Sequence, residues 1–194
     1  FFSYTTWTNG LSTPTGKEYL NNVYNEELVK ADIERVKEEA DVIIVAMHWG
    51  TEYSTGISDT QVEIANYLAN LGVDIIIGSH PHVVEPIEFI GKTMVIYSLG
   101  NFISDQVGVE CLTGLMVSVD IKKTVAKDNT TISLENQVAE LIYTYSNSYP
   151  QKRDFKVYPY SELNDNLLAG YRDYYNKYKD IVLSKTDVVK MKDI

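Results

Sequence analysis

Two short runs of apolar residues each end in a histidine-containing signature. Residues 42–47 lead into His48-Trp49-Gly50, and residues 73–77 lead into Gly78-Ser79-His80-Pro81-His82. Unbroken apolar runs of this length, rich in β-branched residues, are typical of strands that are covered on both faces, as in a parallel sheet. We therefore expect two buried strands, each with histidine at or just beyond its carboxyl end.

The segment between these strands has the pattern of a helix over residues 59–71. Ser58 and Gln61 have the spacing of a capping box, and Gly72 suits the left-handed conformation that ends many helices. Strand, helix and strand in this order predict a right-handed crossover and two parallel strands. Because ligands bind at the carboxyl edge of such sheets, the histidines are expected to meet at one rim.

Weaker patterns predict the other elements. They comprise a strand at 1–6, a helix from Asn25 to 40, a hairpin of 83–89 and 93–99, strands at 112–121 and 131–145 around a loop at 122–129, a Tyr-rich loop or edge at 143–160, and a helix at 161–183. Strands that alternate with helices and are followed by antiparallel strands predict a mixed α/β fold.

Composition narrows the class of protein. The chain has 194 residues, 44% of them hydrophobic, a net charge of −10 and a pI near 4.7. This acidity disfavours nucleic acid and anionic membranes as partners, because both need clustered Lys and Arg. The sequence contains neither an apolar run of the roughly 18 residues that span a bilayer nor a signal-peptide pattern at Phe1. Because it begins without Met, we expect a piece of a longer protein; the single Cys111 leaves the compartment open.

The three histidines of the chain all lie in the two signatures, which favours a metal site over ordinary core histidines. In an extended His80-Pro81-His82 the two imidazoles point to opposite sides, and this suits two neighbouring metals better than one. Glu52 could orient His48 or act as a general acid or base, although an exposed loop carboxylate is nearly as good an explanation.

Three further residues are candidates for contact with a ligand, each with an alternative. Trp49 and Tyr53 could form a pocket wall beside His48, or could simply pack near the sheet edge. Asn101 could bind a ligand or could hold the backbone bend at Gly100.

Three motifs together resemble a known family. His48-Trp49-Gly50-Thr51-Glu52-Tyr53, the Gly78–His82 signature and Tyr97-Ser98-Leu99-Gly100-Asn101-Phe102 occur in the order seen in the bacterial capsule synthesis protein CapA family. This is the poly-γ-glutamate synthesis CapA/PgsA group, a branch of the calcineurin-like metallophosphoesterases. The opening Tyr4-Thr5-x-x-Thr8-Asn9-Gly10 is also similar, and the match covers about residues 1–120.

The resemblance implies part of a four-layer αββα fold, with residues 1–145 as the C-terminal part of the metallophosphoesterase-like domain and residues 146–194 as a Tyr-rich segment and helix packed on it. It also implies a two-metal site of Mn, Fe or Zn, with His48 and His80 on one metal and His82 on the other. The superfamily's bridging Asp, its Asp-x-His and its Asn ligands have no counterpart here. The chain is therefore expected to hold about half of a site and to be inactive alone.

The function implied is the synthesis or export of an anionic capsule polymer at the bacterial cell surface, by a protein that is extracellular or membrane-anchored when complete. Whether it is an enzyme stays open. A metal-dependent phosphoester hydrolase would use His48 and Glu52 in catalysis and Trp49, Tyr53 and Asn101 at the substrate. The alternative is a non-catalytic assembly or polymer-binding module. Expected partners are capsule polymer or a phosphoester, capsule synthase membrane subunits, and the missing part of the domain or a second copy, but no nucleic acid.

Overall fold

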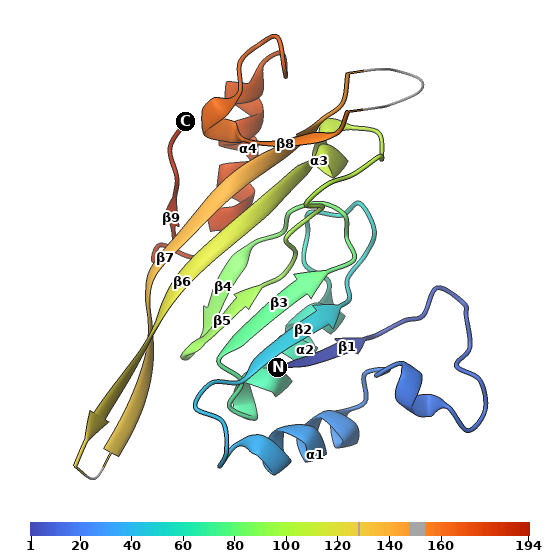
Figure 1. Ribbon diagram of the computed structural model, residues 1–194, viewed down its shortest axis with the longest axis vertical. Helices are drawn as coiled ribbons and strands as arrows, with labels where there is room; N and C mark the ends of the chain where they lie inside the picture. The colour runs from blue at the N-terminus through green and yellow to red at the C-terminus, as the bar shows by residue number, and fades with distance from the viewer. Residues whose placement is uncertain (128, 148–153) are drawn as a thin grey trace.

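The computed structural model describes residues 1–127, 129–147 and 154–194 as a mixed α/β structure (Figure 1). The strands are β1 Phe2–Thr5, β2 Ile44–His48, β3 Ile75–Ser79, β4 Ile87–Ile90, β5 Thr93–Ile96, β6 Thr113–Ala126, β7 Asn129–Tyr145, β8 Lys156–Pro159 and β9 Lys190–Met191. The α-helices are α1 Glu26–Val36, α2 Asp59–Asn70, α3 Val109–Leu112 and α4 Tyr171–Leu183, with 3-10 turns at Glu18–Leu20 and Tyr160–Glu162.

The first sheet has the strand order β1-β2-β3-β5-β4. Its strands run parallel except for β4, which forms an antiparallel hairpin with β5. The predicted strand–helix–strand unit is confirmed: Ser58 and Gln61 form the capping box of α2, and Gly72 follows the helix with φ of +90°. In the register of the sheet, His48 pairs with Thr5 on one side and Ser79 on the other. The carboxyl ends of β1, β2 and β3 therefore meet at one edge.

Helices α1 and α2 cover one face of this sheet. Asn25 begins α1 by accepting hydrogen bonds from two backbone N–H groups of the first turn. The two helices share a core with alternate residues of the strands, and the fully buried members include Val29, Ile33, Leu68, Val45, Met47, Ile76 and Val95. Burial of this face fixes the register, because a slip of one residue would expose the whole set.

The second sheet consists of the long β6–β7 hairpin with β8 and β9 on β7. Figure 1 shows this ribbon running diagonally past the β4–β5 side of the first sheet. Its apolar face shares a core with residues around β4 and β5 and with the tyrosines of α4, including Val84, Ile87, Met94, Leu115, Leu141, Tyr175 and Tyr178. The two facing sheets and the helices confirm the α/β class and a partial metallophosphoesterase-like fold. The division at residue 145 stays a prediction.

The other face of β2 and β3 is only partly covered. Ile44, Ala46 and Ile77 are half-buried there, although central strands of a parallel sheet are normally covered on both faces. A hollow of about 390 Å³ opens between β3 and β6, with Ile77, Ile96, Leu99, Phe102, Leu115 and Met116 in its walls. This apolar hollow marks the side on which the fold is open.

Two sequence-based predictions of elements are wrong. The loop expected at 122–129 is mostly strand, because β6 continues to Ala126 and β7 begins at Asn129. The helix expected at 161–183 begins only at Tyr171, after Gly170 in the left-handed conformation. The Tyr-rich stretch contains β8, and its residues 148–153 lie outside the described part of the chain.

Candidate functional site

The three imidazoles lie together at the carboxyl edge of the first sheet. His48 is the last residue of β2, and His80 and His82 follow β3 directly. The ring centroids of His48 and His80 are 4.4 Å apart, and those of His80 and His82 are 6.3 Å apart. The sequence-based prediction that the two signatures meet at one rim is therefore what the fold produces.

The protonation of His48 follows from its neighbour on β1. Nδ1 of His48 lies 3.0 Å from Oγ1 of Thr5, and the Thr5 hydroxyl donates its own proton to the carbonyl of Trp7 at 2.6 Å. Thr5 can therefore only accept from His48, so the ring proton sits on Nδ1 and Nε2 carries a lone pair. Burial, reinforced by the charges of the other two imidazoles, lowers the pKa of His48 below its usual value and favours this neutral form.

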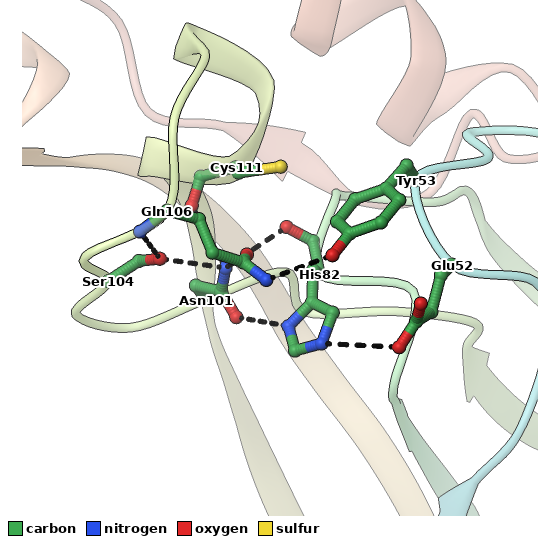
Figure 2. Close-up of polar contacts among 7 residues, drawn as sticks. All are labelled: Glu52, Tyr53, His82, Asn101, Ser104, Gln106 and Cys111. Carbon is green, nitrogen blue, oxygen red and sulfur yellow. Dashed lines mark hydrogen bonds and ion pairs between the residues drawn. The ribbon is translucent and has the colours of Figure 1, made fainter. Parts of the chain in front are cut away.

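His82 has the same arrangement with a different partner. Its Nδ1 lies 3.0 Å from Oδ1 of Asn101, an oxygen that can only accept, so Nδ1 carries the proton (Figure 2). Its Nε2 faces Oε1 of Glu52 at 4.0 Å. Two histidines thus present Nε2 at the rim, each oriented through Nδ1 by a residue behind it.

Asn101 is surrounded by protein partners. Its Nδ2 lies within 2.9 to 3.3 Å of four acceptors, namely the carbonyls of His82 and Cys111, Oγ of Ser104 and Oε1 of Gln106 (Figure 2). An amide nitrogen has only two protons, so no donor is left for a ligand. Of its two interpretations, the one in which Asn101 holds the bend fits the structure.

Tyr53 and Trp49 have different environments. Tyr53 is 56% exposed and stacks on the ring of His82 at 5.8 Å, with its hydroxyl 3.3 Å from Nε2 of Gln106. Trp49 is 1% exposed, and its indole N–H donates to the carbonyl of Tyr97 in the core. Tyr53 is therefore available to a ligand, whereas the burial of Trp49 fits the packing interpretation.

The backbone of the rim is strained. Tyr53, His80 and His82 have φ of +64°, +101° and +62°, in a region that residues other than glycine rarely adopt. Each such residue costs on the order of 1–3 kcal/mol and persists only where its surroundings fix it. A hydrogen bond from Tyr53 N to the carbonyl of Pro81, at 2.8 Å, ties the two strained segments together.

Comparison with known proteins shows the family to which the chain belongs. The family model for the bacterial capsule synthesis protein PGA_cap matches residues 2–106, more than half of the chain. The chain belongs to this family. The resemblance derived from the three motifs is thereby confirmed.

Named relatives agree with this assignment. The chain is 36% identical over 123 residues to the PGA biosynthesis protein CapA of Bacillus subtilis, covering 60% of this chain and 32% of that protein. It is 36% identical over 86 residues to the capsule biosynthesis protein CapA of Bacillus anthracis, covering 42% and 21%. It is 30% identical over 81 residues to a probable polyglutamine synthesis accessory protein of Mycobacterium tuberculosis, again covering 42% and 21%. The chain thus spans a third or less of each relative.

The donor set of this PGA_cap chain does not by itself fit a metal ion. Imidazole Nε2 is a suitable ligand for Zn, Fe or Mn. Within the described ranges, however, no group of three or more His, Cys, Asp or Glu side chains is arranged to hold one. The described residues of the rim therefore do not form a complete metal site by themselves.

Two residues of the rim went unassigned from sequence. Thr5 orients His48, and the ring of Trp7 lies edge-on to His80 with centroids 6.3 Å apart. Thr5 is a named position of the opening motif, and Trp7 is one of its two unspecified positions. The sequence predicts a strand at 1–6 but not its pairing with β2. That pairing brings Thr5 and Trp7 to the rim, because parallel neighbouring strands end at the same edge of a sheet.

Proposed function

We propose that the complete protein works in making or exporting an anionic capsule polymer of the poly-γ-glutamate type at the bacterial cell surface, together with the membrane subunits of a capsule synthase. Membership of the PGA_cap family and the names of the Bacillus relatives support this proposal. None of the described helices is both long and apolar enough to span a bilayer.

The rim is proposed to be one side of a metal-dependent hydrolase site. The observation that carries this proposal is that a partner holds Nδ1 of both His48 and His82, which leaves Nε2 of each ring to face the rim. These residues and His80 would hold Mn, Fe or Zn together with ligands from outside this chain. The bound metal would activate water toward a phosphoester bond.

The chain's own side chains have separate roles in this proposal. The carboxylate of Glu52, which lies 4.0 Å from Nε2 of His82, carries a proton between the rim and water. Tyr53 offers an exposed aromatic face beside His82 on which a substrate can rest. Asn101 and Thr5 hold the two histidines in the orientation and tautomer described above.

The test uses the full-length protein. Metal content is measured after purification without chelators, and hydrolysis of bis(4-nitrophenyl) phosphate is measured with added Mn²⁺, for the wild type and for His80→Ala and His82→Ala. Bound metal and metal-dependent hydrolysis that both fall at least tenfold in the variants would support the site. Metal-free wild-type protein with no hydrolysis would overturn it.

A second function, a non-catalytic module that binds polymer or a synthase subunit, is supported by the exposed ring of Tyr53, which can contact a ligand at the rim without any chemistry. His82→Ala in a capsule-forming cell separates the two functions. A variant that retains wild-type capsule while phosphoester hydrolysis is lost would make hydrolysis irrelevant to the polymer. If the wild type shows no hydrolysis and His82→Ala nevertheless loses the capsule, the binding module is established.

A further inference from the structure

Two polar side chains, Gln61 and Glu85, lie against each other in the core next to the loops that carry the histidines. Both are fully buried, and Nε2 of Gln61 donates to Oε2 of Glu85 at 2.7 Å. Among the described residues, neither side chain is hydrogen-bonded to an imidazole, and the proposed function uses neither. Their contacts on either side indicate what they do.

Gln61 supports the loop that follows β2. Its Oε1 accepts from the backbone N of Ser58 at 2.9 Å and from Oγ of Ser58 at 3.0 Å, which fixes the amide plane. Gly50, with φ of +84°, lies directly on that amide, because a Cβ at Gly50 would come within 2.9 Å of Cδ of Gln61. The loop from His48 to Tyr53 thus crosses the Gln61 side chain at Gly50.

Glu85 anchors the other loop. It follows His82 by three residues, and its backbone N donates to the carbonyl of Ser98 at 3.2 Å. The residues on both sides of it are buried, namely Val83, Val84, Pro86 and Ile87. The Gln61–Glu85 hydrogen bond therefore joins the segment that carries His80 and His82 to the helix end on which Gly50 rests.

This bond has a cost that packing alone does not explain. Oε1 of Glu85 is buried and has no hydrogen-bond partner among the described residues. Burial raises the pKa of Glu85 to about 7 despite the hydrogen bond from Gln61. Replacing buried polar pairs by apolar residues of similar volume is often neutral or stabilising. A purely structural contact at this place would be better made by two aliphatic side chains.

The strained rim supplies the reason for the cost. Tyr53, His80 and His82 hold positive φ, and such backbone persists only where rigid neighbours determine it. We propose that the Gln61–Glu85 pair is a positioning device that locks the His48–Tyr53 loop and the His80–His82 loop in one relative orientation, and so sets the spacing of the three imidazoles.

The biological role of this spacing rests on the proposed function, but the positioning by Gln61 and Glu85 can be tested without measuring that function. All three histidines of the chain lie in the rim, so the imidazole ¹H–¹⁵N correlation spectrum of the ¹⁵N-labelled 194-residue chain reports on this site alone. The spectra are compared for Gln61→Met, Glu85→Met and Glu85→Gln, together with the nuclear Overhauser contact between Tyr53 and His82.

We expect Gln61→Met and Glu85→Met to broaden or split the ring signals of His80 and His82 and to remove the Tyr53–His82 contact. Glu85→Gln keeps an acceptor for Nε2 of Gln61, so its imidazole spectrum should match that of the wild type. Ser58→Ala removes the cap of α2 but leaves the Gln61–Glu85 bond, and it should therefore leave the imidazoles unchanged.

A matched control is Gln137→Met, because Gln137 is also a buried glutamine, and its Nε2 donates to the carbonyl of Leu134 in the second sheet. It should lower stability without altering the imidazole signals. Folded Gln61→Met or Glu85→Met protein with wild-type imidazole spectra would overturn the proposal. If both fail to fold, Gln61→Asn, whose amide is one methylene short of Glu85, decides in the same way.

The outcomes also separate this inference from the hydrolase. Disturbed imidazoles in these variants, with no metal or hydrolysis in the full-length wild type, would leave the positioning device standing without the enzyme. If the imidazole spectra of the variants are unchanged and the full-length wild type shows metal-dependent hydrolysis, the positioning device is ruled out and the hydrolase proposal stands.

Discussion

Asn101 is the side chain on which the orientation of His82 most directly depends. Its Oδ1 accepts a hydrogen bond from Nδ1 of His82, and its Nδ2 joins the backbone at His82 to the loop that reaches Cys111 (Figure 2). Without it, the ring is free to take the other tautomer, and two carbonyls lose a donor. Asn101 therefore acts on the site and on stability together.

For Asn101→Ala we predict a loss of about 1–3 kcal/mol in the free energy of unfolding, because partly buried polar groups are left unpaired. Urea denaturation measures this loss. Asn66→Ala is the control, since Asn66 is exposed on α2 and its side chain donates to the carbonyl of Val62 one turn earlier. Its effect should stay within about 0.5 kcal/mol. Equal effects of the two substitutions would contradict the role given to Asn101.

Glu85 should make stability depend on pH in the direction opposite to that of a paired carboxylate. Its pKa is about 7 when folded against 4.5 for the free side chain, so the folded state binds more protons between these values. Stability is then complete below the lower pKa and falls as the pH rises through the upper one, by up to about 3 kcal/mol.

The measurement is thermal unfolding of the wild type and of Glu85→Gln between pH 5 and pH 8. The difference in stability between the two proteins should grow in favour of Glu85→Gln as the pH rises, because the variant carries no proton to lose. Tyr97 does not titrate in this range, because burial, reinforced by its hydrogen bond to Glu88 and by the charges of Glu88 and Glu85, raises the pKa of its hydroxyl further from neutrality. Profiles that stay parallel would show that Glu85 is not desolvated.

Among the elements, β2, α2 and β3 could be predicted from sequence because short-range features determine them. Apolar runs gave the two strands, and the Ser58–Gln61 capping box gave the start of the helix. The meeting of the histidines at one rim could then be predicted as well, since parallel strands end at the same edge. The elements that depend on long-range packing could not be obtained in this way.

The start of α4 shows why. Leu163, Leu167 and Leu168 have helical spacing, yet they pack into the core from a non-helical segment, and only Gly170 reveals the break. The far ends of β6 and β7 were missed for the opposite reason: residues 121–127 are exposed, so no burial pattern distinguishes strand from loop. Trp49 likewise has a sequence position that suits a pocket wall, whereas its hydrogen bond to Tyr97 places it in the core.

Gly78 in β3 is a position where an added methyl group cannot fit. A Cβ there would overlap the carbonyl of Tyr97 and lie 2.5 Å from Nε1 of Trp49, the two atoms joined by the core hydrogen bond. For Gly78→Ala we predict a loss of about 3 kcal/mol or insoluble protein, because β3 must move away from its neighbours. Solubility and urea denaturation measure it.

Gly72→Ala is the control for Gly78→Ala. Gly72 has φ of +90° but open space around a Cβ, so only the backbone strain of about 1–2 kcal/mol is expected. If Gly78→Ala proved no worse than Gly72→Ala, the close approach of β3 to Tyr97 would be wrong.

On the scale of the whole molecule, the fold is open along β6. Leu115 N bonds to the carbonyl of Leu99, but from Met116 onward no described strand pairs with the outer edge of β6. Met116 is 48% exposed beside the apolar hollow between β3 and β6. Unpaired apolar edges recruit other strands. We propose that the remainder of the family domain, or in its absence a second copy, occupies this place.

For the isolated chain we therefore predict concentration-dependent self-association in sedimentation velocity experiments. Met116→Lys puts a charge on the open edge and should shift the association to at least tenfold higher concentration. Val188→Lys, an exposed apolar position between α4 and β9, is the control and should leave it unchanged. A wild-type chain that stays monomeric at all concentrations tested would rule out this edge as an interface.

The placement of the two tryptophans gives the protein a pair of optical reporters. Trp49 is sealed in the core, whereas Trp7 is 56% exposed and edge-on to His80. Emission from Trp49 should be blue-shifted and resistant to acrylamide, and emission from Trp7 should be red-shifted and readily quenched. A ligand that settles on the rim would change the second component alone, while unfolding would change both. In Trp49→Phe, the remaining fluorescence would follow occupancy of the rim directly.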